Sequence, residues 1–350
     1  MNALSQQIQA LENIWGCLSS LRTEKGRRLH PQEEDSDVIT PRLNQFRLDL
    51  EPKLSMSQGV QRMAAKTQVM TNQFNLHIRT RITHSSEVIA GSSLAAEILG
   101  LNIELSKAIA LGHDMGHPPF GHDGEDFLKE TTHKPFCHEV MSVVIAQHIE
   151  RKGKGLNLTH ETLRGFIRHS RCNNACNGTK LSPEGELVAH EDRINYTVSD
   201  YEDLTERLHY PVPAELRKLM EDLGHDRCER FYVLTTALCI ESAEVGAVSF
   251  SKSDTAQKFR EIMEIMDPIY KILNASNTDD VLMRIFEFLS YHPSHVDPGL
   301  LLALMTDTDV LNLADCPVLD FSALQRTTVN EIIPSLENRI INYCDADLNW

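Results

Sequence analysis

The sequence predicts an all-α protein. Apolar residues recur at intervals of three and four along most of the 350-residue chain, which is the spacing of amphipathic helices. No alternation of apolar and polar residues continues for more than a few positions, so β-strands are not expected. Gly, Pro and polar clusters separate the helical stretches and mark their ends. A hydrophobic content of 41% is ordinary for a globular protein with a large core.

The N-terminal region, residues 1–41, is expected to form one helix followed by a polar connector. The apolar residues on one face of this helix are Leu4, Ile8, Leu11, Trp15, Leu18 and Leu21. Because the opposite face is not basic, we expect the apolar face to pack on protein rather than on a membrane. Mixed charges from Thr23 to Pro41 indicate a loop.

The central region, residues 42–210, is predicted to contain several helices. Their expected ranges are 57–70, 83–99, 105–114, 138–150, 160–167 and 182–208. Gly100 marks the end of the second of these helices. Thr159 is a natural N-cap, and Pro183 is typical of the first turn of a helix.

The C-terminal region, residues 211–350, continues the same pattern. Helical runs are predicted over 214–223, 228–245, 256–273, 279–289, 298–304 and 322–344. Their apolar stripes are typical of core packing. We therefore expect this region to pack on the central region, where it would complete a pocket, form an oligomer interface, or do both.

The composition argues against several classes of protein. A net charge of −16 argues against a surface that binds nucleic acid or anionic membranes. No apolar run reaches the roughly 18–20 residues that span a bilayer, and no secretory signal pattern is found. The eight cysteines lack framework spacing, so free thiols in a cytoplasmic protein are expected. Cys172 and Cys176 are interpreted as loop residues rather than zinc ligands.

The stretch 108–125 places histidines and acids after an apolar helical run. His113 and Asp114 fall on the last turn of this helix, which Gly116 and Pro118 terminate. A His-Asp pair at a helix end is a candidate for metal binding. Without partners, a hydrogen-bonded surface histidine is the commoner explanation.

Two further residues supply those partners. His84 faces inward on the apolar stripe of helix 83–99. Asp192 shares one helix face with Tyr196 and Asp200. For this helix alone, a solvated face is an equally good explanation, but polar residues beside apolar ones on a packed face need partners or a site. Together with the His-Asp pair, they would form an N/O site suited to Mn²⁺, Fe²⁺, Co²⁺, Ni²⁺ or Mg²⁺. Such a site is typical of metal-assisted hydrolysis of phosphate compounds.

The same part of the chain offers groups for acid–base chemistry and phosphate binding. His122 and Glu125 are expected in a loop, three residues apart, where the carboxylate can orient the imidazole as a general acid or base. Arg79 and Arg81 precede His84, and arginine binds phosphate through two hydrogen bonds at once.

Several segments resemble the bacterial dGTP triphosphohydrolases of the HD-domain superfamily. They are, in order, 46–49, Arg62 with 66–69, 79–88, 108–125, 155–159 and 192–200. The most specific are Arg-Thr-Arg-Ile-Thr-His at 79–84 and His-Asp-Met-Gly-His-Pro-Pro-Phe-Gly-His at 113–122. The resemblance is strong over residues 42–210 and implies an HD-domain helical bundle with additional C-terminal helices.

The resemblance implies a role for individual residues. The implied metal ligands are His84, His113, Asp114 and Asp192, and the implied catalytic pair is His122 with Glu125. The residues implied to bind phosphates or deoxynucleoside are Gln68, Arg81, His117, His138, Tyr196 and Asp200, with Arg62 and Arg79 as further basic residues. The implied reaction converts a dNTP to deoxynucleoside and inorganic triphosphate, in a homo-oligomer that also binds an effector nucleotide in some members.

Some positions depart from the family pattern. Members usually carry Phe-Arg-Arg-Leu before Lys-Thr-Gln, where this chain has Val60-Gln61-Arg62-Met63, and carry Asn and Arg where Glu139 and Val144 stand. Base preference and an effector site therefore stay open. Two other functions also stay open: hydrolysis of deoxynucleoside monophosphates or cyclic nucleotides, and nucleotide sensing without turnover.

Overall fold

Helices are the regular secondary structure of the described part of the chain. The computed structural model describes residues 3–31, 44–68, 77–167, 181–273, 278–316 and 319–350. Within these ranges no β-strand occurs, and the only β-type pairs are the isolated bridges Arg28–Thr159 and Thr67–Thr80. The predicted all-α fold is therefore confirmed.

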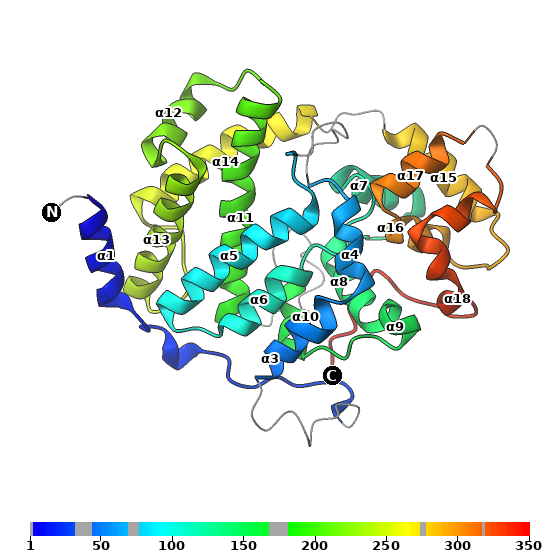
Figure 1. Ribbon diagram of the computed structural model, residues 1–350, viewed down its shortest axis with the longest axis horizontal. Coiled ribbons are helices and arrows are strands. Elements are labelled where there is room, and N and C mark those ends of the chain that lie inside the picture. The colour runs from blue at the N-terminus through cyan, green and yellow to red at the C-terminus, as the bar shows by residue number, and fades with distance from the viewer. Residues whose placement is uncertain (1–2, 32–43, 69–76, 168–180, 274–277, 317–318) are drawn as a thin grey trace.

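Three helices form the centre of the molecule (Figure 1). They are α5 (Arg81–Leu99), α6 (Ile103–Gly112) and α11 (Pro183–Glu202), and they pack against one another. The side chains of Asn102 and Ser182 accept backbone hydrogen bonds that cap α6 and α11. These three helices, with the turn after α6, carry all the predicted metal ligands.

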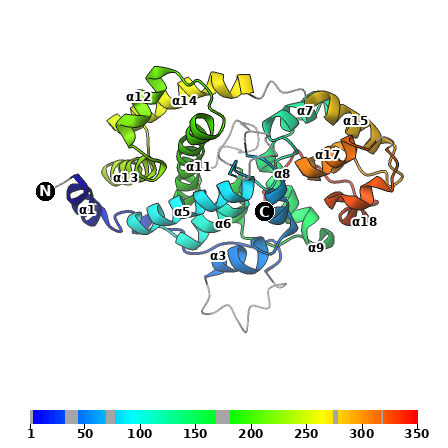
Figure 2. The same cartoon turned by 45° about the horizontal axis from the view of Figure 1, so that its top comes forward.

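Two groups of helices flank this centre (Figures 1 and 2). The first flank comprises α1 (Ala3–Ile14), α12 (Ala214–Leu223), α13 (Arg227–Val245) and α14 (Asp254–Leu273). The second flank comprises α7 (His122–Thr132), α15 (Thr278–Ser290), α16 (Pro298–Leu304), α17 (Asp307–Ala314) and α18 (Ile333–Leu336).

Short elements complete the described chain. The remaining α-helices are α3 (Gln45–Leu48), α4 (Gln58–Arg62), α8 (His138–Val144), α9 (Glu150–Gly153) and α10 (His160–Phe166). The 3-10 and π segments are η1 (Ser19–Leu21), η4 (Asp49–Leu54), η5 (Met63–Ala65), η6 (Ile145–Ile149), η7 (Asp203–Arg207), η8 (Ala323–Arg326) and η9 (Thr328–Glu331).

Each flank has its own apolar core. Leu99 of α5, Leu187 of α11 and Leu238 of α13 belong to the core of the first flank. Met141 of α8 and Leu313 of α17 belong to the core of the second flank. On the first side α13 packs on α5 and α11, and on the second side α15 and α16 pack on α7. The C-terminal helices therefore lie on both sides of the centre.

The second half of the chain differs from the prediction in two places. The helix predicted over 322–344 is replaced by η8, η9 and α18. The backbone N–H of Thr328 donates to a side-chain oxygen of Asp309 at 3.0 Å instead of extending a helix, and Pro334 has no N–H to donate. Helix α17 was not predicted, because it is short and its N-terminal turn is polar.

The N-terminal half also differs in three places. The helix predicted over 57–70 stops at η5, because the backbone of Lys66–Gln68 pairs with that of Arg79–Arg81 instead; residues 69 and 70 lie outside the described ranges. The first helix ends at Ile14, which leaves Trp15 58% exposed. The predicted loop containing His122 is the first turn of α7, where acidic residues favour a helix N-terminus.

The predictions about membranes and cysteines have separate outcomes. None of the helices in the described ranges is both long and apolar enough to cross a bilayer. The cysteines in those ranges are free thiols. Cys172 and Cys176 lie outside the described residues.

Candidate active site

The turn after α6 carries His113 and Asp114 and is hydrogen-bonded to α8. The N–H of Gly116 donates to the hydroxyl of Ser142 at 2.9 Å, and that hydroxyl donates to the carbonyl of His113 at 2.7 Å. A Cβ at Gly116 would lie 2.1 Å from the carbonyl oxygen of His138. Only glycine allows this close approach, so the turn is held at the N-terminus of α8.

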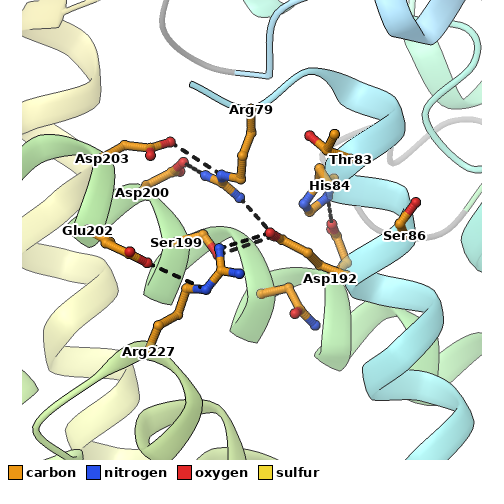
Figure 3. Close-up of polar contacts among 12 residues, drawn as sticks. Arg79, Thr83, His84, Ser86, Asp192, Ser199, Asp200, Glu202, Asp203 and Arg227 are labelled. Carbon is orange, nitrogen blue, oxygen red and sulfur yellow. Dashed lines mark hydrogen bonds and ion pairs between the residues drawn. The ribbon is translucent and has the colours of Figure 1, made fainter. Parts of the chain in front are cut away.

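The predicted metal ligands His84, His113, Asp114 and Asp192 form one buried cluster, here called the four-ligand group. Nε2 of His84 lies 2.9 Å from Oδ1 of Asp192 (Figure 3). Nε2 of His113 lies 3.6 Å from that oxygen and 3.6 Å from Oδ1 of Asp114. Such separations fit donors that share one ion at about 2.1 Å.

The chemistry of this group also fits a divalent metal. Nδ1 of His113 donates to the carbonyl of Ala110 at 2.8 Å, so Nε2 is the nitrogen that faces the carboxylates and that offers a lone pair to a metal once its proton is lost. Burial lowers the pKa of His113, but Asp114 and Asp192 raise it to about 9. Buried carboxylates thus require positive charge here, which a proton or a cation supplies. Mixed imidazole and carboxylate donors suit Mn²⁺, Fe²⁺, Co²⁺, Ni²⁺ or Mg²⁺.

Arg81 places a second positive charge beside this group. Its guanidinium donates to Oδ2 of Asp114 at 2.8 Å and to the carbonyl of Gln68 at 3.0 Å. Burial raises the pKa of Asp114, but the charges of His113, His117 and Arg81 hold it well below the usual range. The side-chain oxygen of Gln68 is buried and accepts no hydrogen bond from the described residues. It is therefore suited to accept one from a ligand.

His117, His122 and His138 form a second cluster, here called the three-histidine group. The rings of His117 and His138 stack with centroids 3.6 Å apart, and His122 meets them edge-on at 5.2 and 5.7 Å. Nε2 of His117 lies 3.2 Å from Oδ1 of Asp114. The two clusters are therefore parts of one continuous site.

Glu125 contacts a different histidine from the one expected. Its Oε2 accepts a hydrogen bond from Nδ1 of His138 at 2.6 Å, and its Oε1 lies 2.8 Å from Nζ of Lys129. The first turn of α7 directs the carboxylate toward the N-terminus of α8, where the backbone N–H of His138 also donates to it at 3.4 Å. Glu125 thus orients His138 rather than His122.

The surroundings separate the pKa values of these two histidines. Burial lowers the pKa of His138, but Glu139 and Glu125 raise it to about 9. His122 keeps access to solvent, yet desolvation by the surrounding protein and the charges of His138 and Arg81 lower its pKa to about 4. Without a ligand at neutral pH, His138 is charged and His122 is neutral.

Arg79 binds carboxylates of α11 and η7 (Figure 3). It forms ion pairs with Asp200 and, at 3.2 Å, with Asp203, and its Nη1 lies 3.4 Å from Glu87. The expectation that Arg79 grips phosphate therefore needs correction, because three acids surround its guanidinium. The hydroxyl of Tyr270 donates to the other oxygen of Asp200 at 2.9 Å.

Sequence reasoning missed two residues that the structure places beside the predicted ones. Tyr270 lies on α14, whose apolar stripe was interpreted as core and interface packing, with no individual residue assigned to the site. Lys66 is 1% exposed and donates to the carbonyl of His117; burial and the charge of Arg62 lower its pKa to about 7. Arg62 is buried, and its Nε and Nη2 donate to no described residue. The Lys-Thr-Gln motif signalled Lys66, whereas no local signal marked Tyr270.

Comparison with known proteins agrees with this geometry. A family model described as HD domain matches residues 81–197. A deoxyguanosinetriphosphate triphosphohydrolase-like protein of Clostridium tetani (strain Massachusetts / E88) is 30% identical over 277 residues, which cover 77% of this chain and 77% of the relative.

Two further relatives carry the same name. That of Caldanaerobacter subterraneus subsp. tengcongensis is 32% identical over 272 residues, covering 77% of this chain and 76% of the relative. That of Clostridium perfringens (strain SM101 / Type A) is 41% identical over 180 residues, covering 51% and 52%. The chain therefore belongs to the HD-domain phosphohydrolase family that includes these triphosphohydrolase-like relatives.

Proposed function

We propose that this protein is a metal-dependent triphosphohydrolase that converts dNTPs to deoxynucleosides and inorganic triphosphate. The observation that carries the proposal is the contact between Asp114 of the four-ligand group and His117 of the three-histidine group. A metal-binding cluster thus adjoins a proton donor and fixed positive charges within one site. The names of the relatives add the substrate class.

The phosphates would lie between the two clusters. Arg81, His117 and charged His138 present positive charge or N–H donors at that place, which favours a polyanion. Gln68 offers an unpaired oxygen to the deoxynucleoside. Tyr196 and Asp200, on the same face of α11 as Asp192, would contact the sugar, and Tyr270 with Arg79 would hold the Asp200 carboxylate in place.

The four-ligand group would hold the metal, which, when bound, supplies Lewis-acid chemistry at a phosphoryl oxygen. Water attacks the α-phosphorus and the bond from phosphorus to the 5′-oxygen breaks. His122 gives its proton to the leaving 5′-oxygen, and the proton of the attacking water passes to the triphosphate or to solvent. Because bound triphosphate is strongly negative, it raises the pKa of His122 from about 4. The imidazole is then protonated and can donate its proton. Glu125 acts through His138.

The test is product analysis of the purified protein with each of the four dNTPs and Mn²⁺. Triphosphate and deoxynucleoside are expected, with loss of turnover in His122→Ala. Release of pyrophosphate or single phosphates would contradict the proposal. Turnover of deoxynucleoside monophosphates or cyclic nucleotides alone would favour the second substrate class. A nucleotide-dependent rise in Tm without turnover under any metal would favour a sensing regulator.

Mixtures of dNTPs extend the same assay to regulation. We propose a homo-oligomer with an effector nucleotide, as the family resemblance implies. Activation of one dNTP's hydrolysis by another would support the effector, and size-exclusion chromatography with light scattering would give the number of subunits.

A further inference from the structure

A carboxylate from the C-terminal region ties together two segments of the site. Asp307 begins α17 and is 4% exposed. Its Oδ2 accepts hydrogen bonds from the N–H of Thr67 at 2.9 Å and from the hydroxyl of Thr67 at 2.7 Å. Its Oδ1 accepts one from the N–H of Phe120 at 2.9 Å. One side chain therefore joins segments that are far from it, and from each other, in the sequence.

Both segments carry groups of the candidate site. Thr67 lies between Lys66 and Gln68, whose carbonyl accepts from Arg81. Phe120 lies in the loop that connects His117 to His122. Lys66 adds a second link, because its ammonium donates to the carbonyl of His117. The spacing between the Gln68 side and the histidine side of the site thus depends on these few buried contacts.

The loop needs such support because its backbone is strained. Phe120 has φ +60° and Gly121 has φ +61° with ψ −123°. An aromatic residue at positive φ is uncommon and strained. Strained conformations of this kind persist where the surroundings fix them. The hydrogen bond from the Phe120 N–H to Asp307 does so at the strained residue itself.

Asp307 also interacts electrostatically with Lys66. Burial and the neighbouring charge of Arg62 disfavour protonated Lys66, whereas Asp307 and Asp309 favour it. Asp307 thus connects helix α17 of the C-terminal region to the segment that contains the basic residue Lys66. Asp309, two residues later, is equally buried, but it accepts its hydrogen bonds from Thr306 and Thr328 within the C-terminal region.

We propose that Asp307 is a positioning residue that holds the Lys66–Gln68 segment and the His117–His122 loop at the separation that catalysis requires. This inference rests on the proposed function. It also means that the site is complete only when the second flank is packed in place. It assigns to the C-terminal region a part in turnover beyond core packing. Since the four-ligand group lies on α5, on α11 and in the turn after α6, and Asp307 accepts the hydrogen bonds described above from Thr67 and Phe120 rather than from that group, metal binding should not depend on Asp307.

The test compares Asp307→Asn with Asp309→Asn in the full-length protein. Three quantities are measured for each variant: kcat for triphosphate release, affinity for Mn²⁺, and hydrogen–deuterium exchange of the peptides that contain Thr67 and Phe120. In Asp307→Asn we expect faster exchange in both peptides, unchanged Mn²⁺ affinity, and a kcat about 10- to 100-fold below that of Asp309→Asn. Asp309→Asn should lose thermal stability and keep the wild-type kcat.

The opposite results overturn the proposal. Wild-type exchange in both peptides of Asp307→Asn, or a kcat equal to that of Asp309→Asn, would show that Asp307 only stabilises the fold. Should Asp307→Asn fail to fold, Thr67→Val removes one of the three bonds. It is expected to speed exchange around Thr67 and lower kcat, and no change in either overturns the proposal. If the wild type releases no triphosphate, the proposed function fails, while the exchange comparison still decides whether Asp307 holds the segments.

Discussion

Replacing Gly121 with alanine tests whether the loop before α7 fixes Arg81. The backbone at Gly121 has φ +61° and ψ −123°, a combination that residues with a Cβ avoid. The added Cβ would lie 2.6 Å from Nη2 of Arg81. Arg81 is buried and bound to Asp114 and Gln68, so it cannot withdraw without breaking those contacts.

The expected magnitude follows from two costs. The backbone conformation costs an alanine about 1–3 kcal/mol, and the overpacking costs about 1–3 kcal/mol more. The free energy of unfolding should therefore fall by about 2–6 kcal/mol. For 350 residues, each kcal/mol lowers Tm by about 1.4 °C, which gives a drop of roughly 3–8 °C. A shift of Arg81 by about 1 Å should lower kcat roughly 100-fold.

Gly246→Ala is the matched control. Gly246 has φ +72°, but an added Cβ there meets nothing within 4 Å. It should lose only about 1–2 kcal/mol of stability and keep wild-type kcat. Differential scanning calorimetry and dNTP hydrolysis are measured on both variants. If Gly121→Ala keeps the kcat of Gly246→Ala, the loop does not fix Arg81 and the reasoning is wrong.

Three further predictions concern single contacts. Asp114→Ala should abolish the rise in Tm that Mn²⁺ produces, whereas His122→Ala should keep it and lose turnover; equal loss of metal binding would contradict this division. Burial lowers the pKa of His138, but the adjacent acids raise it from 6.5 to about 9, so its stabilising ion pair is complete below pH 6.5 and lost as pH rises through about 9. The difference in Tm between wild type and Glu125→Gln should shrink over that interval, and a constant difference would argue against the pair. Tyr270→Phe removes one hydrogen bond worth about 0.5–1.5 kcal/mol, so KM should rise about 2- to 10-fold with little change in kcat; a fall in kcat alone would place Tyr270 in the chemistry instead.

The central helices and the four-ligand group could be predicted because their signals are local. Helical periodicity placed His84 and Asp192 on inward faces, and cap residues marked where the helices begin. The family resemblance implied that the His-Asp pair joins them, and the packing of α5, α6 and α11 brings the four side chains together. For these elements, spacing along the chain indicates which face each side chain occupies.

Other features depend on contacts that one sequence does not display. Glu125 lies on the same turn as His122. Because the start of α7 lies beside the N-terminus of α8, however, the carboxylate of Glu125 accepts a hydrogen bond from His138. The segment 322–344 has helical periodicity, but the backbone N–H of Thr328 donates to the side chain of Asp309 and not to a carbonyl of a continuous helix. Asp307 and Tyr270 join the site from C-terminal helices whose stripes are typical of core packing. Tertiary hydrogen bonds, absent from any local pattern, decide each case.

The proposed reaction breaks the bond between the α-phosphorus and the 5′-oxygen of a dNTP. Turnover in H₂¹⁸O, followed by mass spectrometry of both products, tests it most directly. Because water attacks the phosphorus, we expect ¹⁸O in the triphosphate and none in the deoxynucleoside. Label in the deoxynucleoside, or a deoxynucleoside monophosphate with pyrophosphate as the products, would contradict it.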